Sequence, residues 1–157
     1  LFDYSDAAYI FLLFLVFMLA STALALALAA LFNRGMAAAV ASSIFYVLGY
    51  AIYEATYMES VPRATKRAAC LHPVTCFTLA TIPLAEYEES GVGITADTLD
   101  SAENNNFTVA DALGMLSLDI VLFLLLAWYL DQVAPKEWGV PRPWYFLFQA
   151  RYWREVF

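Results

Sequence analysis

The sequence has few charged residues for its length. Only 15% of its 157 residues are charged, whereas soluble domains average about 25%. Apolar residues make up 62% of the chain, compared with roughly 45–50% in soluble proteins. A chain with so little polar surface cannot keep its helices in water, so this composition excludes an ordinary soluble domain.

Catalytic patterns are also missing. His72 is the sole histidine and has no serine–acid pair near it. The sequence contains neither the G-x-x-x-x-G-K-[ST] loop that cradles phosphate nor the H-E-x-x-H zinc helix. We therefore assign no catalytic residue to the chain.

Basic residues are scarce. Eight lysines and arginines stand against fifteen acidic residues, giving a net charge of -7, and this argues against a nucleic-acid partner because phosphate binding needs clustered cations. Four of the eight follow Asp131, and Arg34 lies between the first two apolar runs. The positive-inside rule then places Arg34 and the tail in the cytosol, although three basic residues between 63 and 67 oppose that count.

Three long apolar runs dominate what is present, at about residues 7–32, 36–53 and 109–132. Each is long enough to cross a hydrocarbon core of about 30 Å at about 1.5 Å per helical residue. We predict an all-α membrane protein with three transmembrane helices. Alanines in the first run, including Ala23 and Ala27, either allow close approach of a second helix or belong to a plain lipid-facing span.

The segment from 54 to 108 does not fit a further span. Its apolar pieces, 68–71 and 74–85, are short, and Pro73 and Pro83 should break them. Apolar stretches of about 10–14 residues read better as re-entrant or interfacial segments. We predict a short re-entrant helical hairpin that enters and leaves the outer leaflet on one side, followed by an exposed loop.

Asp119 lies ten residues beyond Val109, about 15 Å along the third span and hence near the middle of the membrane. A carboxylate there is costly and usually faces a partner, a cavity or a substrate path. We favour a role in helix packing or an inner cavity over direct contact with substrate. We also expect leucine to be more damaging than asparagine there, because it would strand a donor.

Cys70, His72 and Cys76 lie close together in the sequence, but with no fourth ligand candidate they make a weak metal site. A disulfide between the two cysteines is an alternative if the segment is extracellular. A continuous helix would separate their Cα atoms by roughly 9 Å, beyond the bonding range of about 7 Å, so Pro73 would have to break it. Free apolar thiols are the third alternative.

Asn106-Phe107-Thr108 has the form of an N-glycosylation acceptor, with Asn106 as the candidate site. The same segment reads equally as a helix cap, because Thr108 followed by Asp111 fits a capping box.

The segment 133–157 mixes aromatic and basic residues beside the last span, which is typical of a cytosolic interfacial anchor on an anionic leaflet. The candidate anchors are Trp138, Trp144, Tyr145 and Trp153.

Several motifs together resemble the ABCA subfamily of ATP-binding cassette transporters. Asp119 is followed by Trp128-Tyr129-Leu130-Asp131, and then by the proline- and aromatic-rich stretch 135–146, in an order similar to the end of that family's first transmembrane domain. Tyr4-Ser5-Asp6 and 87–93 (Tyr-Glu-Glu-Ser-Gly-Val-Gly) resemble its "YSD" and "FEEQGIGV" signatures. His72 departs from the serine usual in the family.

The resemblance implies that residues 1–157 are part of a transmembrane domain. It implies ATP-driven movement of phospholipid or sterol, with this chain forming path wall and coupling to missing nucleotide-binding domains, to which Mg-ATP would belong. The implied partners are membrane lipids and the remaining domains, in the plasma membrane or an endomembrane. The alternative is a truncated ABCA-derived chain serving as a non-transporting subunit or scaffold.

Overall fold

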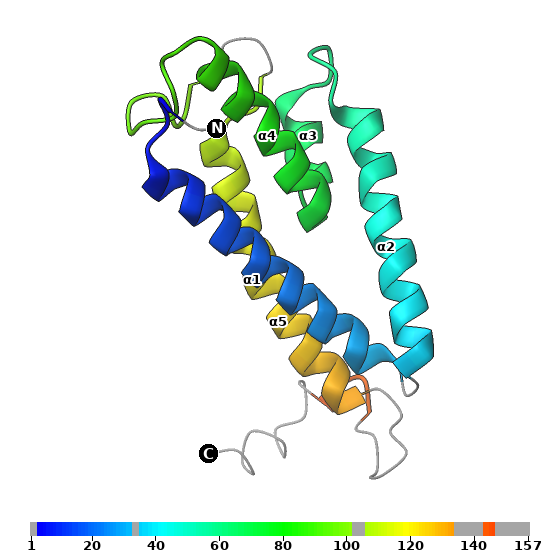
Figure 1. The fold of residues 1–157 in the computed structure, drawn as a ribbon. Helices are drawn as coiled ribbons and strands as arrows, with labels where there is room; N and C mark the ends of the chain where they lie inside the picture. Colours follow the sequence, from blue (N-terminus) through cyan, green and yellow to red (C-terminus); the bar gives the residue numbers. More distant parts are fainter. Residues whose placement is uncertain (1–2, 33–34, 102–105, 134–142, 147–157) are drawn as a thin grey trace.

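The computed structural model describes residues 3–32, 35–101, 106–133 and 143–146. Within these ranges the chain forms five α-helices and no strand, so the predicted all-α class is confirmed (Figure 1). The helices are α1 (Ala7–Leu31), α2 (Gly35–Thr56), α3 (Arg63–Ala69), α4 (Pro73–Glu89) and α5 (Val109–Val133). Three of them, α1, α2 and α5, are long and apolar enough to cross a membrane.

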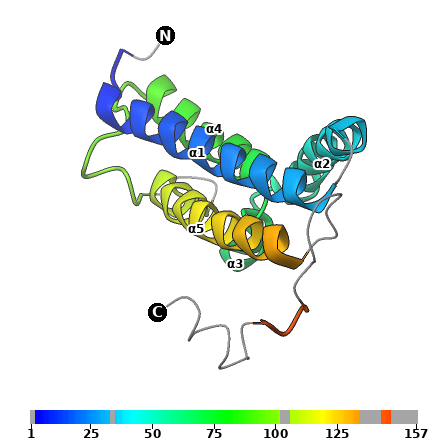
Figure 2. The ribbon, with the colours of Figure 1, turned by 90° about the horizontal axis from the view of Figure 1, so that it is seen from below.

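Helices α1 and α5 lie side by side and run in the same direction (Figures 1 and 2). Buried residues on α5 recur every three or four positions, which places them on one helical face. The facing stripe of α1 includes Ala20, Ala23 and Ala27, each at most 3% exposed. These alanines therefore serve close helix packing, as the first of the two alternatives for this run predicted.

Helix α2 runs in the opposite direction; it starts beside the end of α1 and diverges from α1 and α5 toward its own far end (Figure 1). It continues beyond the predicted end at residue 53 to Thr56, whose hydroxyl donates to the carbonyl of Ile52 at 2.8 Å. Of its 22 residues, only Gly49 and Thr56 are buried within the described chain. Such a helix, apolar and exposed on nearly every side, needs lipid or other helices around it.

The segment after α2 forms the expected pair of short helices, but Pro83 does not break the second one. Helix α4 begins at Pro73, where a missing N–H costs nothing, and runs through Pro83 to Glu89. Pro83 is buried, so the packing of the ring against neighbouring helices outweighs the one backbone hydrogen bond that it removes. The prediction that both prolines interrupt the segment is therefore wrong for Pro83.

The contacts of this pair have the geometry of a re-entrant hairpin. At its tip, the ring of His72 lies 2.9 Å from the Phe45 carbonyl (Nε2 to O), near the middle of α2. Phe45 is ten residues into α2, or about 15 Å from its start. At its two ends, Arg63 contacts Asp111 in the first turn of α5, and Glu88 contacts the residues before α1. The hairpin thus starts and finishes at one end of the long helices and reaches about halfway along them.

Candidate functional site

Asp119 is the buried acid of the core. It lies on the inward stripe of α5, between Leu116 and Phe123, and is 0% exposed. Neither carboxylate oxygen has a hydrogen-bond partner among the described residues. Asp119 therefore faces protein rather than lipid, in a setting where an unpaired ionised carboxylate would be very costly.

The expected donor to Asp119 is not found in the part of the chain that the structure describes. The packed core around it, from α1, α4 and α5, is formed by aliphatic and aromatic side chains together with Cys70 and Cys76. Ser21 of α1 is another side chain with a buried oxygen and no described partner. From the sequence we expect leucine at position 119 to be especially harmful, because it would leave a hydrogen-bond donor without its acceptor. Among the described residues there is no such donor, so that reason does not hold.

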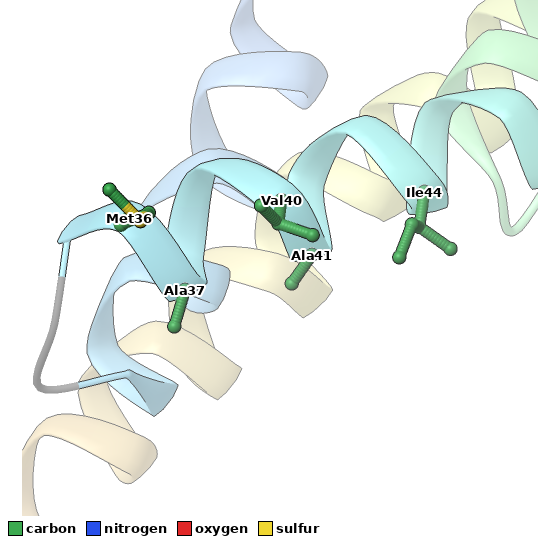
Figure 3. Close-up of a pocket in the computed structure, with 5 residues that line it drawn as sticks. All are labelled: Met36, Ala37, Val40, Ala41 and Ile44. Carbon is green, nitrogen blue, oxygen red and sulfur yellow. The ribbon is translucent and has the colours of Figure 1, made fainter.

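The start of α2 carries a shallow apolar pocket of about 470 Å³. Figure 3 shows its five lining side chains along one face of the helix. They are Met36, Ala37, Val40, Ala41 and Ile44. Because these side chains are small or flexible and nonpolar, the surface suits acyl chains or a partner helix and offers no hydrogen bond to orient a polar group.

The hairpin tip is fitted closely to α2. The His72 ring stacks on Phe45 with centroids 4.5 Å apart, and the Thr75 hydroxyl donates to the Gly49 carbonyl at 2.7 Å. A Cβ at Gly49 would stand 2.3 Å from His72 Cε1, so this crossing requires glycine. Burial lowers the pKa of His72 below its usual value, which favours the neutral ring.

An ion-pair cluster joins the hairpin to α5. Asp111 accepts hydrogen bonds from Arg63 Nε at 2.7 Å and from Arg67 Nε at 2.9 Å. Its side chain is 4% exposed, whereas the two arginine side chains are 42% and 50% exposed. Asp100 adds a further contact to Arg63 at 3.2 Å. A carboxylate this buried needs such donors, because unpaired it would be strongly destabilising.

The predicted capping box at the start of α5 is confirmed. The amide of Asp111 donates to the hydroxyl of Thr108 at 3.1 Å, and the amide of Thr108 donates back to Asp111 Oδ2 at 3.4 Å. Thr108 is 1% exposed while Asn106 is exposed. The cap reading of this segment therefore holds, and glycosylation at Asn106 stays a prediction.

The two segments that resemble family signatures at 4–6 and 87–93 meet in space. Glu88 accepts the hydroxyl of Ser5 at 2.6 Å and the amide of Tyr4 at 3.0 Å. These hydrogen bonds lower the pKa of Glu88, and the bond from the Ser5 hydroxyl has the largest effect. Gly93, with φ of +71°, lies so close to the backbone of Tyr4 that no Cβ would fit. We call this contact of 3–6 with 87–94 the N-terminal latch.

The remaining predicted site residues lie as follows. Cys70 and Cys76 are both buried as free thiols, and no disulfide joins them; the Cys76 thiol points to the Ala112 carbonyl at 3.7 Å. Trp144 and Tyr145 are exposed, and the Trp144 carbonyl accepts the hydroxyl of Tyr129 at 2.9 Å. Trp138 and Trp153 lie outside the described residues.

Sequence reasoning missed the roles of Arg63, Arg67 and His72. The two arginines are one helical turn apart, so they share a helix face, and together with an acid in the first turn of α5 that spacing would have predicted the cluster. No signal in the sequence indicates that His72 packs on α2, because that contact joins segments with no local pattern in common.

Comparison with known proteins agrees with this architecture. The sequence profile of the ABC-2 family transporter proteins matches residues 1–129, which include α1 to α4 and most of α5. The chain belongs to the ABC-2 transporter family. This ABC-2 chain is 35% identical over 154 residues to the retinal-specific phospholipid-transporting ATPase ABCA4 of Bos taurus.

Other members of the ABCA subfamily are similar. The chain is 32% identical over 158 residues to the ATP-binding cassette sub-family A member 2 of Homo sapiens, and 31% identical over 153 residues to the human phospholipid-transporting ATPase ABCA7. Each alignment covers 96% of this chain but only 6% or 7% of the relative. The resemblance to the ABCA subfamily is therefore confirmed, and the chain spans a small part of the relatives' length.

Proposed function

We propose that this chain is the later part of the first transmembrane domain of an ABCA-like, ATP-driven lipid transporter. The observation that carries the proposal is the exposure of α2, an apolar helix of membrane length whose surface is left mostly uncovered by the rest of the described chain, in an ABC-2 family member. Its uncovered surface would form path wall and contact lipid together with the remaining transmembrane segments. Phospholipid as the substrate class rests on the relatives ABCA4 and ABCA7, which are phospholipid-transporting ATPases. Sterol is the alternative that the resemblance to the ABCA subfamily implies.

Mg-ATP would bind to nucleotide-binding domains outside this chain. The hairpin, held to α1 by the N-terminal latch and to α5 by the Asp111 cluster, would lie in the outer leaflet and move with those helices as a unit. Trp138, Trp144, Tyr145 and Trp153 would anchor the cytosolic end, in the plasma membrane or an endomembrane.

The decisive test is lipid movement by the full-length protein in proteoliposomes. Fluorescent phospholipid or sterol should change leaflet, or leave to an acceptor, with ATP and not with a non-hydrolysable analogue. No movement of either lipid class by folded, ATP-hydrolysing protein contradicts the proposal.

The alternative is a non-transporting scaffold derived from such a transporter. The mass of the native polypeptide separates the two. A product close to 17.5 kDa supports the scaffold, whereas a far larger one supports the transporter.

The proposed topology puts Arg34 and the tail in the cytosol and residues 54–108 on the outer side, where Asn106 would carry a glycan. Cysteine labelling in sealed cells tests it. A cysteine at Ser101, which is exposed, should react with an impermeant reagent, and one at Gly35 should react only after permeabilisation. Labelling of Gly35→Cys from outside overturns this topology.

A further inference from the structure

A second pocket lies at the outer end of α2, away from Asp119. Its volume is about 480 Å³ and it lies between the turn that follows α2 and the outer half of α4. Its walls combine carboxylate, aromatic and apolar side chains. They are Tyr57, Met58, Glu59, Ser60, Ile82 and Glu86.

A buried lysine lies near the acids of this pocket. Lys66 on α3 is 0% exposed. Burial lowers its pKa, while Glu59 and Glu86 act in the opposite direction, so both carboxylates are close enough to stabilise its charge. Two carboxylates and one ammonium leave a formal charge of -1. Arg63 and Arg67, the other cations of α3, are paired with Asp111.

A row of three tyrosine rings ends at this pocket, because the last of them, Tyr57, lines it. The rings of Tyr50 and Tyr53, in the last turns of α2, are 6.0 Å apart, and those of Tyr53 and Tyr57, the residue after the helix, are 5.6 Å apart. Tyrosine rings at the end of a span favour the membrane interface. The pocket thus lies at the level of lipid headgroups once α2 crosses the membrane as proposed.

These features select one ligand chemistry. A surplus negative charge beside an aromatic face and apolar side chains suits an organic ammonium group, whose charge is attracted to both carboxylate and ring. A phosphate is disfavoured, because Lys66 is too buried to reach it. Among the described residues, no group of three or more His, Cys, Asp or Glu side chains could hold a metal ion.

We propose that this pocket binds the ammonium headgroup of a phospholipid in the outer leaflet. Glu59 would contact the ammonium and Tyr57 would cover one side of it. The proposal rests on the proposed function for its placement at the outer membrane surface. It adds a headgroup class and a site that lies apart from the apolar surface of α2.

The test uses full-length protein in nanodiscs and photoreactive lipids. Phosphatidylethanolamine and phosphatidylglycerol, each carrying a diazirine in the acyl chain next to the glycerol, are cross-linked and the modified peptides are mapped. The ethanolamine lipid should label residues 57–60 and 82–86 more strongly than the glycerol lipid does. Glu59→Gln should reduce that labelling by about three- to tenfold, and Tyr57→Leu more than Tyr57→Phe.

Glu89→Gln is the matched control, because Glu89 is an exposed acid of α4 that does not line the pocket. Equal labelling by both lipids, or no difference between Glu59→Gln and Glu89→Gln, overturns the proposal. Competition by excess choline chloride as strong as that by phosphatidylcholine vesicles would show a site for free organic ammonium ions and overturn the assignment to a lipid headgroup. Competition by the vesicles alone supports the lipid headgroup.

Lipid movement measured on the same preparations separates this site from the transport function. Cross-linking at the pocket with no transport would defeat only the proposed function. Transport with no headgroup-dependent cross-linking would defeat only the pocket.

Discussion

Glu88, at the end of α4, accepts the hydroxyl of Ser5 at 2.6 Å across 83 residues of sequence. The same carboxylate accepts backbone amides of the segment before α1, including Tyr4 at 3.0 Å and Ser5 at 3.2 Å. These amides lie before α1 and need an acceptor outside it; Glu88 supplies that acceptor, while Asp6 caps the helix itself by accepting the amide of Ala8 at 2.9 Å. The hairpin and the first span therefore share one set of hydrogen bonds.

Glu88→Gln should loosen the N-terminal latch. The amide keeps one acceptor oxygen but turns an NH₂ group toward backbone donors. We expect hydrogen exchange at the amides of Tyr4 and Ser5 to become about fivefold faster, measured by mass spectrometry on full-length protein. Glu89→Gln should leave exchange unchanged, and identical exchange in both variants would show that the latch is not held by Glu88.

Asp111→Asn should destabilise the protein, because it weakens the only buried acceptor described for Arg63 and Arg67. The expected loss is about 1–3 kcal/mol in the free energy of unfolding. Asp100→Asn is the matched control, since its side chain is 77% exposed and exposed pairs contribute about 0–1 kcal/mol. Thermal unfolding of the purified protein gives the comparison, and equal losses from both substitutions would refute the ranking.

Gly49→Ala should separate the hairpin tip from α2, because the new methyl group would overlap the His72 ring. Overpacking of this kind costs about 1–3 kcal/mol. His72→Ala in the Gly49→Ala background should recover part of the loss, so a double-mutant cycle on thermal unfolding should show coupling.

Gly114→Ala provides the control for this cycle. It lies in α5 with no atom within 4 Å of its added methyl group, and it should be neutral or stabilising. Additive effects of the Gly49 and His72 substitutions would show that the two residues do not meet.

The stability of the hairpin should fall in mild acid through His72. Burial lowers the pKa of His72 below its ordinary value, so the unfolded chain takes up a proton that the folded chain resists. Stability should therefore be full above about pH 6.5 and decline as pH falls toward the lowered pKa. The thermal midpoint, followed between about pH 7.5 and pH 5.5, should drop less in His72→Asn than in wild type. Parallel curves for the two proteins would exclude His72 as the cause.

Asp119→Val should stabilise the α1–α5 core while lowering function. It replaces a buried carboxyl that has no described partner by an apolar group of similar size, and the expected gain is about 1–3 kcal/mol. We expect lipid-stimulated ATPase activity of the full-length protein to fall, because costly intramembrane acids are commonly retained for function. Leu118→Val, at an exposed neighbour on the same helix, should change neither quantity. A stabilised variant with full activity would assign Asp119 no role in transport.

The sequence alone was sufficient for the helical class, the three long helices and the cap at Thr108. These features are local: apolar runs of membrane length, and a threonine placed three residues before an acid, depend on neighbours along the chain. Its motif order also indicated the ABCA subfamily. The same local reasoning failed at Pro83, because the preference of proline against a helix interior is outweighed there by burial of its ring in tertiary packing.

Only the tertiary structure decided which side chains meet. It paired Glu88 with Ser5 and Asp111 with two arginines, placed His72 against Gly49, and showed Asp119 to be buried without a described partner. It also brought the turn after α2 against α4 to form the pocket beside Lys66. Each of these contacts depends on the packing and relative depth of separate helices, and periodicity within one helix carries no information about either.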